Sequence, residues 1–589
     1  MPELSSFLDT IGQFFGSMGH QAQYMFLYIL RILVPVLALV VIVKCYRSVK
    51  LGRRPEAPVM ILEDISSHTR IPVLYWENSI GRSKSCDISL PDATMSRDHA
   101  VLMRREQGWF IIDTNSKAGT SLNGKRLKPT RRAQVFPGDT IAMGSSTLRL
   151  QPAMESDVKK RRFSFSGSGR AASPFGTLLL TALIHVLMAI QCCFAPMEED
   201  QAFSPIPLAL LGALLVIEFG FYLFSTKGLG RVSFEVETVA LLFSGIGIFL
   251  LAGDDVSTAL TQLVAMVGGI VIFCILIWFM GDLERVTKWR LPLALCAVGL
   301  LALTLVIGTS INGSKNWIFI GPVSIQPSEL AKIVFIFAGA ATLDKLQTTR
   351  NLTEFIVLAA LCGGCLVLMK DLGSAAVFFV TFLIISFMRS GSIRTIVLSC
   401  SAVVIGLFMF LQARPYAAAR FQGWRNVWDH INDNLGYQQS RTLTYTASGG
   451  FFGTGLGDGY LHNVAAGNSD LVFGMMAEEL GLLLAVITAL SMVLWIFYAR
   501  TDVTRSRSTF YSISACAAAG ILVFQSLLNI FGPLDVIPLT GVTLPFISAG
   551  GSSMLSVWGM VAFIKASDER TYAVRRRTVS ASKSRKAKP

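Results

Sequence analysis

Residues 260–280 read LTQLVAMVGGIVIFCILIWFM, an apolar stretch that contains no charged side chain. An α-helix needs about 20 apolar residues to cross the roughly 30 Å of hydrocarbon in a bilayer. Backbone groups inside lipid must be hydrogen-bonded within the segment itself, which a helix achieves. This stretch therefore predicts a transmembrane helix.

The same pattern recurs along the chain. Of the 589 residues, 52% are hydrophobic and 15% are charged, a balance typical of a membrane protein. We predict thirteen membrane-spanning helices, near residues 24–43, 175–193, 206–225, 236–253, 260–280, 291–309, 329–343, 353–369, 371–388, 393–412, 471–499, 509–531 and 543–564. The first run could be a signal peptide, but no Lys or Arg precedes it and no small-residue cleavage site follows it, which favours a retained anchor.

The basic residues indicate the orientation of these helices. Lys and Arg collect in short cytoplasmic loops, and five of them follow the first run, whereas acidic residues 198–200 lie between the second and the third. This count places the N-terminus and loops 310–328 and 413–470 outside, and the basic tail, residues 567–589, in the cytoplasm. The net charge of +14 is spread without a basic face or a nucleic-acid motif, which predicts contact with membrane lipids and not with nucleic acid.

Residues 59–152 have a different character. Short stretches that alternate apolar and polar residues, such as 100–103, are separated by turn signals such as Asn123-Gly124 and Pro137-Gly138-Asp139. This pattern predicts a small all-β sandwich, which the orientation places in the cytoplasm. A basic linker rich in Ser and Gly, residues 153–173, follows and is typical of a flexible tether at the membrane surface.

Five short motifs occur in order within this domain. They are Ile80-Gly81-Arg82-Ser83, Asp87-Ile88, Met95-Ser96-Arg97-Asp98-His99-Ala100, Trp109-Phe110-Ile111-Ile112-Asp113 and Gly119-Thr120-Ser121-Leu122-Asn123-Gly124. The set resembles a forkhead-associated (FHA) domain, which implies a reader of phosphothreonine peptides on a Thr-phosphorylated cytoplasmic protein. An Arg guanidinium and a Ser hydroxyl on loops can clamp a dianionic phosphate. The resemblance assigns peptide binding to Arg82, Ser96, Lys117, Thr120 and Asn123, and makes His99 a brace behind the loop.

One position departs from the FHA pattern. The Asn that usually contacts the peptide is replaced by Ala118. Lys117 could compensate for the phosphate charge, or the domain could be a docking module that needs no phosphate, or a β domain without a ligand. These three alternatives stay open at the level of sequence.

Charged residues are rare inside the apolar runs of the membrane part. Each costs on the order of 3 kcal/mol in hydrocarbon unless it faces a partner or a cavity, so each is a functional candidate. Glu329 and Lys332 lie three apart on one helix face and could simply pair with each other. The full set is Glu218, Glu329, Lys332, Lys370, Asp371, Glu478 and Glu479, with Asp470 at the start of a run.

Five motifs surround these residues in a fixed order. They are Asn312 to Ile318 with Gln326-Pro327-Ser328-Glu329-Leu330-Ala331-Lys332, then Asp371-Leu372-Gly373-Ser374-Ala375, Gly449 to Gly457, Ser469-Asp470 through Gly481, and Leu544 to Ser553. The set resembles the SEDS family of peptidoglycan polymerases (FtsW, RodA, SpoVE), which implies a ten-helix core over residues 236–566. The anchor in residues 1–58 and two helices in residues 174–235 are then additions. The expected fold class is a polytopic α-helical membrane protein with this core, three extra N-terminal spans and an inserted all-β FHA sandwich.

The SEDS resemblance implies polymerisation of lipid II into glycan strands at the outer membrane face during cell division or elongation, beside a class B penicillin-binding protein. An inverting glycosyl transfer needs a carboxylate base for the acceptor hydroxyl and cations near the leaving pyrophosphate. Asp470 matches the family's essential Asp, and Lys332, beside Glu329, is the best intramembrane cation. Substrate contacts are expected from Trp317, Arg425, Arg441, Asp371 and Glu478, with Arg414 and Arg420 as further phosphate contacts.

The site departs from the family in two respects. Lys370 replaces the usual Pro before Asp371, and a local pair with Asp371 is its expected role. The acidic residue that commonly precedes the base is missing, and Ala466 lies in its place. This leaves open whether a divalent cation (Mg²⁺ or Mn²⁺) assists, and whether the chain polymerises at all; a lipid II flippase and a non-catalytic scaffold that recruits phosphoproteins are the alternatives. The Gly-rich run 449–459 lacks a following Lys-Ser/Thr pair and is predicted outside, which excludes a nucleotide site.

Overall fold

The computed structural model describes residues 20–568 except for short internal ranges. The ranges left out are 52–59, 74–76, 84–85, 106–107, 130, 154–172, 195–203, 230–232, 312, 322, 343–348, 391–392, 414–422, 434–435 and 504–507. The predicted basic linker and nearly all of the predicted basic tail therefore lie outside the described residues, as do Arg414 and Arg420.

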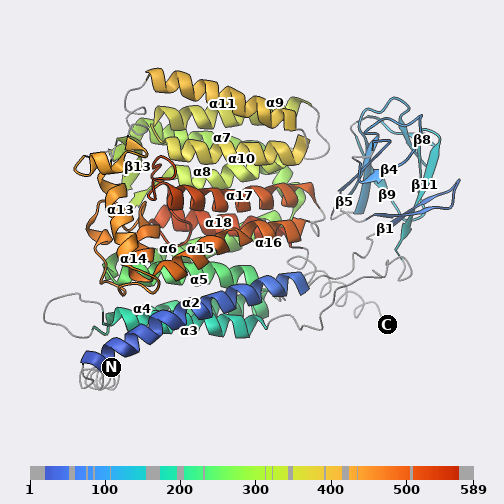
Figure 1. Cartoon of the computed structure of the whole chain (residues 1–589). Coiled ribbons are helices and arrows are strands. Elements are labelled where there is room, and N and C mark those ends of the chain that lie inside the picture. The colour runs from blue at the N-terminus through green and yellow to red at the C-terminus, as the bar shows by residue number, and fades with distance from the viewer. Residues whose placement is uncertain are drawn as a thin grey trace.

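The helices lie side by side with their long axes roughly parallel, as a bundle (Figure 1). Their bounds are α2 His20–Leu51, α3 Pro174–Cys192, α4 Ile206–Leu223, α5 Glu235–Ala252, α6 Val256–Met280, α7 Leu283–Ile307, α8 Pro327–Thr342, α9 Thr349–Leu368, α10 Leu372–Ser390, α11 Ile393–Ala413, α13 Tyr437–Ser448, α14 Val472–Glu479, α15 Leu482–Met492, α16 Leu494–Val503, α17 Thr509–Phe531 and α18 Gly551–Ser567. Eight stretches within the described residues are helical, long and apolar enough to cross a membrane, and three further apolar helices are shorter. The chain is thus a multi-pass membrane protein.

Every predicted span overlaps a helix, but two of the spans are wrong in part. The span 471–499 is broken into α14, α15 and α16. Gly481 lies at the first break with a φ of +90°, and a Cβ there would come 2.4 Å from the carbonyl oxygen of Phe451. Such a φ and so close an approach of two backbones need glycine. The span 543–564 becomes helical only at Gly551, after a loop that belongs to the site described below.

The three N-terminal helices form a layer against the core. α5 is buried along its whole length, and it packs on α2 and α3 on one side and on α6 and α18 on the other. Figure 1 shows α2, α3 and α4 next to α5 at one edge of the bundle. A surface of α5 that would otherwise face lipid is therefore covered by helices from the start of the chain.

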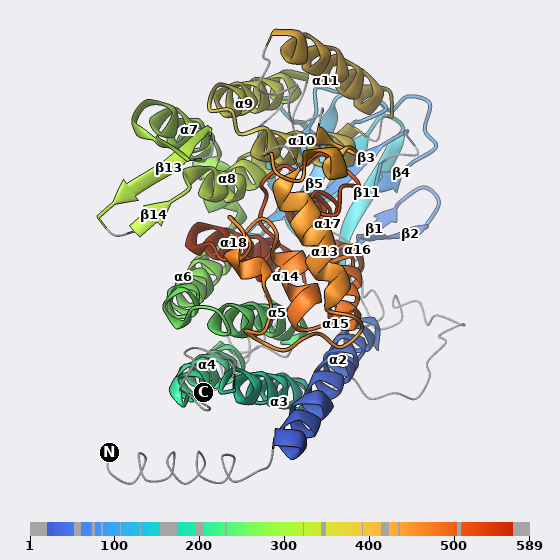
Figure 2. The same ribbon diagram turned by 60° about the vertical axis from the view of Figure 1, so that its left-hand side comes forward.

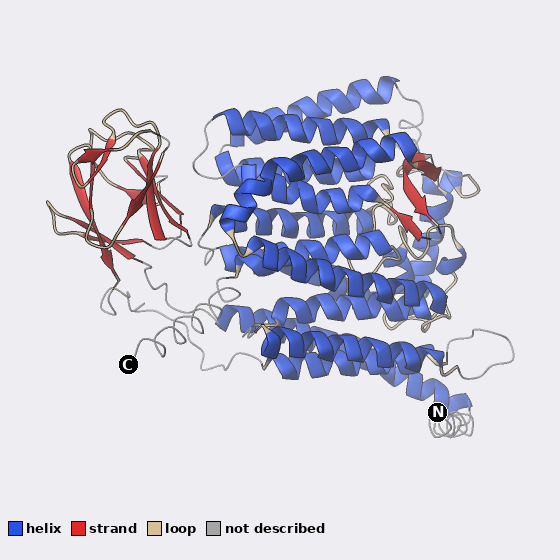
Figure 3. Ribbon diagram, turned by 180° about the vertical axis from the view of Figure 1, so that it is seen from behind, coloured by secondary structure: helices blue, strands red, loops and turns tan. Residues whose placement is uncertain are grey.

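The soluble domain is the expected all-β sandwich of two sheets (Figure 3). One sheet has the strand order β2-β1-β11-β10-β7-β8 and the other β4-β3-β5-β6-β9. Alternating strand residues such as Leu62, Leu102, Ile111 and Leu150 fill the core between the sheets. The strands are β1 Met60–Asp64, β2 Arg70–Val73, β3 Glu77–Gly81, β4 Ile88–Ser89, β5 Ala100–Arg105, β6 Gly108–Asp113, β7 Thr120–Leu122, β8 Lys125–Arg126, β9 Arg132–Val135, β10 Thr140–Met143 and β11 Ser146–Pro152.

The two ends of the bundle carry different structures. The β sandwich lies at one end, and α13 lies at the opposite end with a small antiparallel sheet of β12 Thr309–Ile311, β13 Ser314–Ile320 and β14 Val323–Ile325 (Figures 1 and 3). Figure 2 shows α13 and α14 lying across this second end, with β13 and β14 projecting beside them. The two loops predicted to share one side of the membrane are therefore at one end, and the sandwich is at the other.

Candidate functional site

Asp470 lies in the loop that leads into α14, at the α13 end of the bundle. The side chain is half-buried, and the backbone around it is tightly held. The amide of Asp470 donates to the carbonyl of Ala466 (3.0 Å), and its own carbonyl accepts from Nδ2 of Asn529 on α17 (3.0 Å). Ala466 adopts a φ of +64°, a left-handed conformation that tightens this turn.

The loop between α17 and α18 completes the support of Asp470. Oγ of Ser548 donates to the carbonyl of Ser469 (2.6 Å), and the amide of Ala549 donates to the carbonyl of Asn468 (2.9 Å). Gly541 has a φ of +67°, and a Cβ at this position would lie 3.4 Å from Oδ2 of Asp470. Two predicted motifs far apart in the sequence are thus in direct contact at this carboxylate.

Glu478 and Glu479, at the other end of α14, hold the Gly-rich run 449–459. The carboxylate of Glu478 accepts from the amides of Tyr460 (2.8 Å) and Leu461 (3.0 Å), and that of Glu479 accepts from the amide of Gly457 (2.9 Å). Both glutamates are fully buried. Glu478 thus holds a loop in this structure, and its expected contact with substrate stays a prediction.

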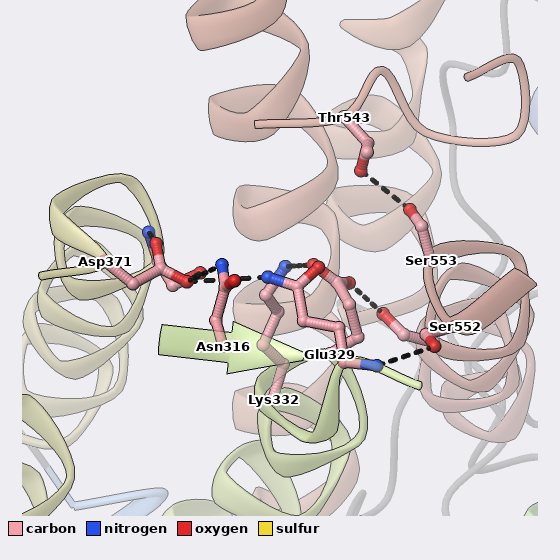
Figure 4. A network of polar contacts seen from close by, with 10 residues as sticks. Asn316, Glu329, Lys332, Asp371, Thr543, Ser552 and Ser553 are labelled. Carbon is pink, nitrogen blue, oxygen red and sulfur yellow. Dashed lines mark hydrogen bonds and ion pairs between the residues drawn. The ribbon is translucent and has the colours of Figure 1, made fainter. Parts of the chain in front are cut away.

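Glu329 and Lys332 form a buried ion pair on α8. Nζ of Lys332 lies 2.6 Å from Oε1 of Glu329, and Oγ of Ser556 on α18 donates to Oε2 of Glu329 (3.0 Å). Figure 4 shows the pair inside the bundle, between β13 and α18. The ion pair considered from the sequence is present, and the hydrogen bond from Ser556 joins this pair on α8 to α18.

Asp371 lies beside this pair, at the start of α10. Its carboxylate accepts from Nδ2 of Asn316 on β13 (3.1 Å), from the amide (3.0 Å) and the hydroxyl (2.9 Å) of Ser374, and from Nε2 of Gln326 (3.4 Å). The main-chain amide of Gln326 in turn donates to Oγ of Ser552 (3.0 Å), so β13, α10 and α18 meet here (Figure 4). Thr543 and Ser553 share a hydrogen bond of 2.7 Å in the same view.

The remaining predicted substrate residues lie at the same end but in different elements. Trp317 is half-buried on β13. The guanidinium of Arg425 lies over the ring of Trp424, and the Arg425 amide donates to Asp535 (3.1 Å). Arg441 lies over the ring of Tyr437 on α13. The contact of these three residues with substrate stays a prediction.

Two supporting residues, Asn529 and Gln262, lie outside the motifs of the sequence analysis, whereas Ser548 lies within the motif Leu544 to Ser553. Asn529 and Ser548 hold the loop of Asp470, and Gln262 on α6 grips the loop before α18 by donating to the carbonyl of Ser548 (2.9 Å) and accepting from the amide of Gly550 (3.1 Å). A lone amide inside an apolar run also costs free energy to bury unless it is hydrogen-bonded, although less than a charged group does. That cost would have identified Asn529 and Gln262.

In the sandwich, the structure brings together three of the five predicted peptide residues. The amide of Arg82 donates to the carbonyl of Ser96 (3.0 Å), and the amide of Lys117 donates to Oγ of Ser96 (2.9 Å). Arg82 and Lys117 are exposed. His99 is buried behind the loops, where Nδ1 accepts from the Ser96 amide (3.2 Å) and Nε2 lies 3.2 Å from the carbonyl of Gly119, as expected of a brace.

The other two predicted peptide residues make contacts within the domain, and their binding to a peptide stays a prediction. Thr120 is buried and its hydroxyl donates to Asp113 (2.7 Å), while Asn123 bridges Asp139 (2.8 Å) and the amide of Thr140 (2.9 Å) across a turn. Arg126, which the sequence analysis missed, donates to the carbonyl of Ala118 (3.3 Å). A second guanidinium thus lies next to the position where the usual Asn is absent.

Within the described residues, no group of three or more His, Cys, Asp or Glu side chains is arranged to hold a metal ion. The donor set therefore offers no ready site for the divalent cation considered above.

Comparisons with known proteins cover both parts of the chain. A family model described as "Cell cycle protein" (FtsW/RodA/SpoVE) matches residues 239–572, and an FHA-domain model matches residues 78–144. A probable peptidoglycan glycosyltransferase FtsW of Pseudoalteromonas translucida is 32% identical over 45% of this chain and 68% of its own length. The peptidoglycan glycosyltransferase RodA of Mycobacterium bovis is 27% identical over 55% of this chain and 76% of its own. A solved structure concerned with polymerisation and crosslinking by a peptidoglycan synthase complex is 25% identical, with a TM-score of 0.48 over 59% of this chain and 98% of its own.

Proposed function

The chain belongs to the FtsW/RodA/SpoVE family, and from this premise we propose that it is a peptidoglycan glycosyltransferase that polymerises lipid II. The observation that carries the proposal is the convergence of remote family motifs on Asp470. Loops from before α14 and before α18, together with Asn529 of α17, all hold the backbone that presents this carboxylate.

The proposed reaction uses Asp470 as general base. Asp470 takes the proton of the acceptor sugar hydroxyl, whose oxygen attacks the anomeric carbon of the donor. The bond to the lipid pyrophosphate breaks with inversion, and its electron pair leaves with the pyrophosphate oxygen. We propose that Lys332, which Glu329 orients, stabilises the negative charge of this leaving group. Substrate contacts are proposed for Trp317, Arg425, Arg441 and Asp371.

The proposed topology places this site at the outer membrane face. The positive-inside count puts the α13 end outside and the sandwich in the cytoplasm. The separation of the two structures at opposite ends of the bundle supports this assignment (Figure 1). Lipid II, and a class B penicillin-binding protein that crosslinks the strands, are the proposed partners on the outer side.

Glycan synthesis in lipid nanodiscs tests this function. The full chain, its cognate penicillin-binding partner with any transferase activity of its own disabled, and labelled lipid II are incubated, and strands are resolved on gels. We expect strands from the pair and none from the partner alone. Transfer of lipid II across liposomes without strands would replace the proposal by a flippase, and neither activity, with phosphopeptide binding intact, would replace it by a scaffold.

We further propose that the FHA domain binds phosphothreonine peptides through Arg82, Ser96 and Lys117. The side chains of Arg82 and Lys117 are exposed and that of Ser96 is half-buried, and the three residues lie on adjoining loops joined by hydrogen bonds. A guanidinium, a hydroxyl and an ammonium are the groups that a phosphate dianion requires. Arg126, held against Ala118, is a candidate for the contact that the missing Asn would make.

Replacing Arg82 with Ala should weaken binding of a phosphothreonine peptide pool to the full chain at least tenfold. The reason is that charge-assisted hydrogen bonds contribute about 1.5–3 kcal/mol each. Fluorescence anisotropy measures the affinity, with the unphosphorylated pool as reference and Arg97→Ala, an exposed neighbour, as matched control. Equal binding by both variants would remove phosphate recognition from this surface and favour phosphate-independent docking.

A further inference from the structure

One charged residue of α2 lies in the middle of an apolar helix. Arg31 is the single Lys, Arg, Asp or Glu between His20 and Lys44. α2 precedes the region that the family model matches, residues 239–572, so the family's own chemistry gives no reason for this residue. Because a charge in a membrane-spanning helix is costly, its partners indicate what it does. The side chain of Arg31 is 8% exposed and faces the core.

The guanidinium of Arg31 contacts the Gly-rich run 449–459. Nη1 donates to the carbonyl of Gly453 (3.2 Å), and Nη2 lies 3.7 Å from Oδ2 of Asp458. A Cβ on Gly455 would come 2.3 Å from Nη2, so glycine here leaves the space that the guanidinium fills. Tyr28, one turn earlier on α2, meets the ring of Phe452 edge-on at 5.9 Å.

The Gly-rich run 449–459 is also hydrogen-bonded to the last residues of α14. The amides of Thr454 and Gly455 donate to the carbonyls of Glu478 (2.9 Å) and Glu479 (3.0 Å), and the amide of Gly457 donates to the Glu479 carboxylate (2.9 Å). These bonds fix the end of an eight-residue helix whose other end directly follows Asp470. A displacement of the run would therefore shift α14 and, with it, the proposed base.

We propose that Arg31 is a positioning residue for the transferase site. The helix that precedes the FHA domain, α2, would then contribute to the rate of polymerisation. This inference rests on the proposed function for its catalytic consequence. Arg31 acts through the Gly-rich run and α14, and does not touch substrate. α2 continues from this contact to Leu51, and the first strand of the FHA domain begins at Met60, so α2 is the helix that precedes this domain in the chain and also contacts the support of the site.

Arg31→Gln should lower the rate of glycan polymerisation about tenfold, because small displacements of a catalytic group have effects of this size or larger. The fall should appear in kcat and leave KM for lipid II within about twofold. Arg31→Lys keeps the charge for Asp458 but cannot bridge two acceptors in the same way, and should lie between wild type and Arg31→Gln. In a double-mutant cycle, Asp458→Asn should cost less when Arg31 is already Gln.

Ser48→Ala is the matched control. It removes the hydrogen bond between Oγ of Ser48 and Glu235 on α5 (2.8 Å), a contact of the same helix with the core near its other end. A merely structural role for α2 predicts equal effects of both variants, whereas a positioning role predicts a rate loss for Arg31→Gln alone. Thermal unfolding in nanodiscs checks that both variants are folded.

Hydrogen–deuterium exchange gives a second readout that needs no activity. Amides of residues 453–461 should exchange about tenfold faster in Arg31→Gln than in wild type, with the amides of α17 unchanged. If wild type fails to polymerise, the proposed function falls, and exchange still decides whether Arg31 orders the run. If wild type polymerises and Arg31→Gln matches it, or if exchange of the run is unchanged, the positioning role is overturned.

Discussion

Asp470→Asn should reduce glycan polymerisation by a factor of about 100 to 10,000 and leave the fold intact. An amide has the size of a carboxylate but cannot accept the proton of the acceptor hydroxyl. The contacts that hold the backbone here, from Asn529, Ser548 and Ala466, use main-chain atoms of residues 466–470 and do not change with the side chain.

Strand synthesis with labelled lipid II and the penicillin-binding partner measures this loss. Asp433→Asn is the matched control, because Asp433 is an exposed carboxylate at the same end of the bundle, paired with His430 at 3.1 Å. Thermal unfolding should be unchanged in both variants. Equal strand synthesis by wild type and Asp470→Asn would remove this carboxylate from the mechanism and leave the general base to be found elsewhere.

The sequence was sufficient to predict the membrane-spanning helices and the β sandwich, but not the positions where a predicted helix is interrupted. The helical period, the apolar length and the turn signals depend on neighbouring residues, so the helices and the sandwich were predictable. Gly481 breaks a run of high hydropathy because its backbone packs on the carbonyl of Phe451, a residue 30 positions earlier. Hydropathy averages over a window and cannot detect such a tertiary contact.

The same division applies to the candidate site. Asp470, Glu329, Lys332 and Asp371 were identifiable as costly charges within or beside apolar runs. Their arrangement depends on contacts between remote segments, such as that of Ser548 with the residue before Asp470. Glu478 shows the consequence, because its charge indicated a function but could not indicate its contacts with Tyr460 and Leu461, which hold the loop.

Lys332→Met should destabilise the protein by about 3–5 kcal/mol, because it leaves the Glu329 carboxylate buried without its cation. Both side chains are almost fully buried, and the pair is 2.6 Å apart. Glu329→Gln with Lys332→Met removes both charges and should restore most of the lost stability, since replacing a buried pair as a whole is often close to neutral. Unfolding in nanodiscs measures both changes, with exposed Lys288→Met as the control.

The folded double variant should nevertheless polymerise lipid II at least 100-fold more slowly than wild type. The bundle retains this pair beside Asp371, Asn316 and Gln326, an accumulation of polar groups that packing alone does not require. The two neutral side chains of the double variant support the fold but supply no positive charge for the leaving pyrophosphate. The double variant therefore separates an effect on stability from an effect on catalysis. Wild-type rates from the stable double variant would assign the pair to helix packing and transfer the role of leaving-group cation to Arg425 or Arg441.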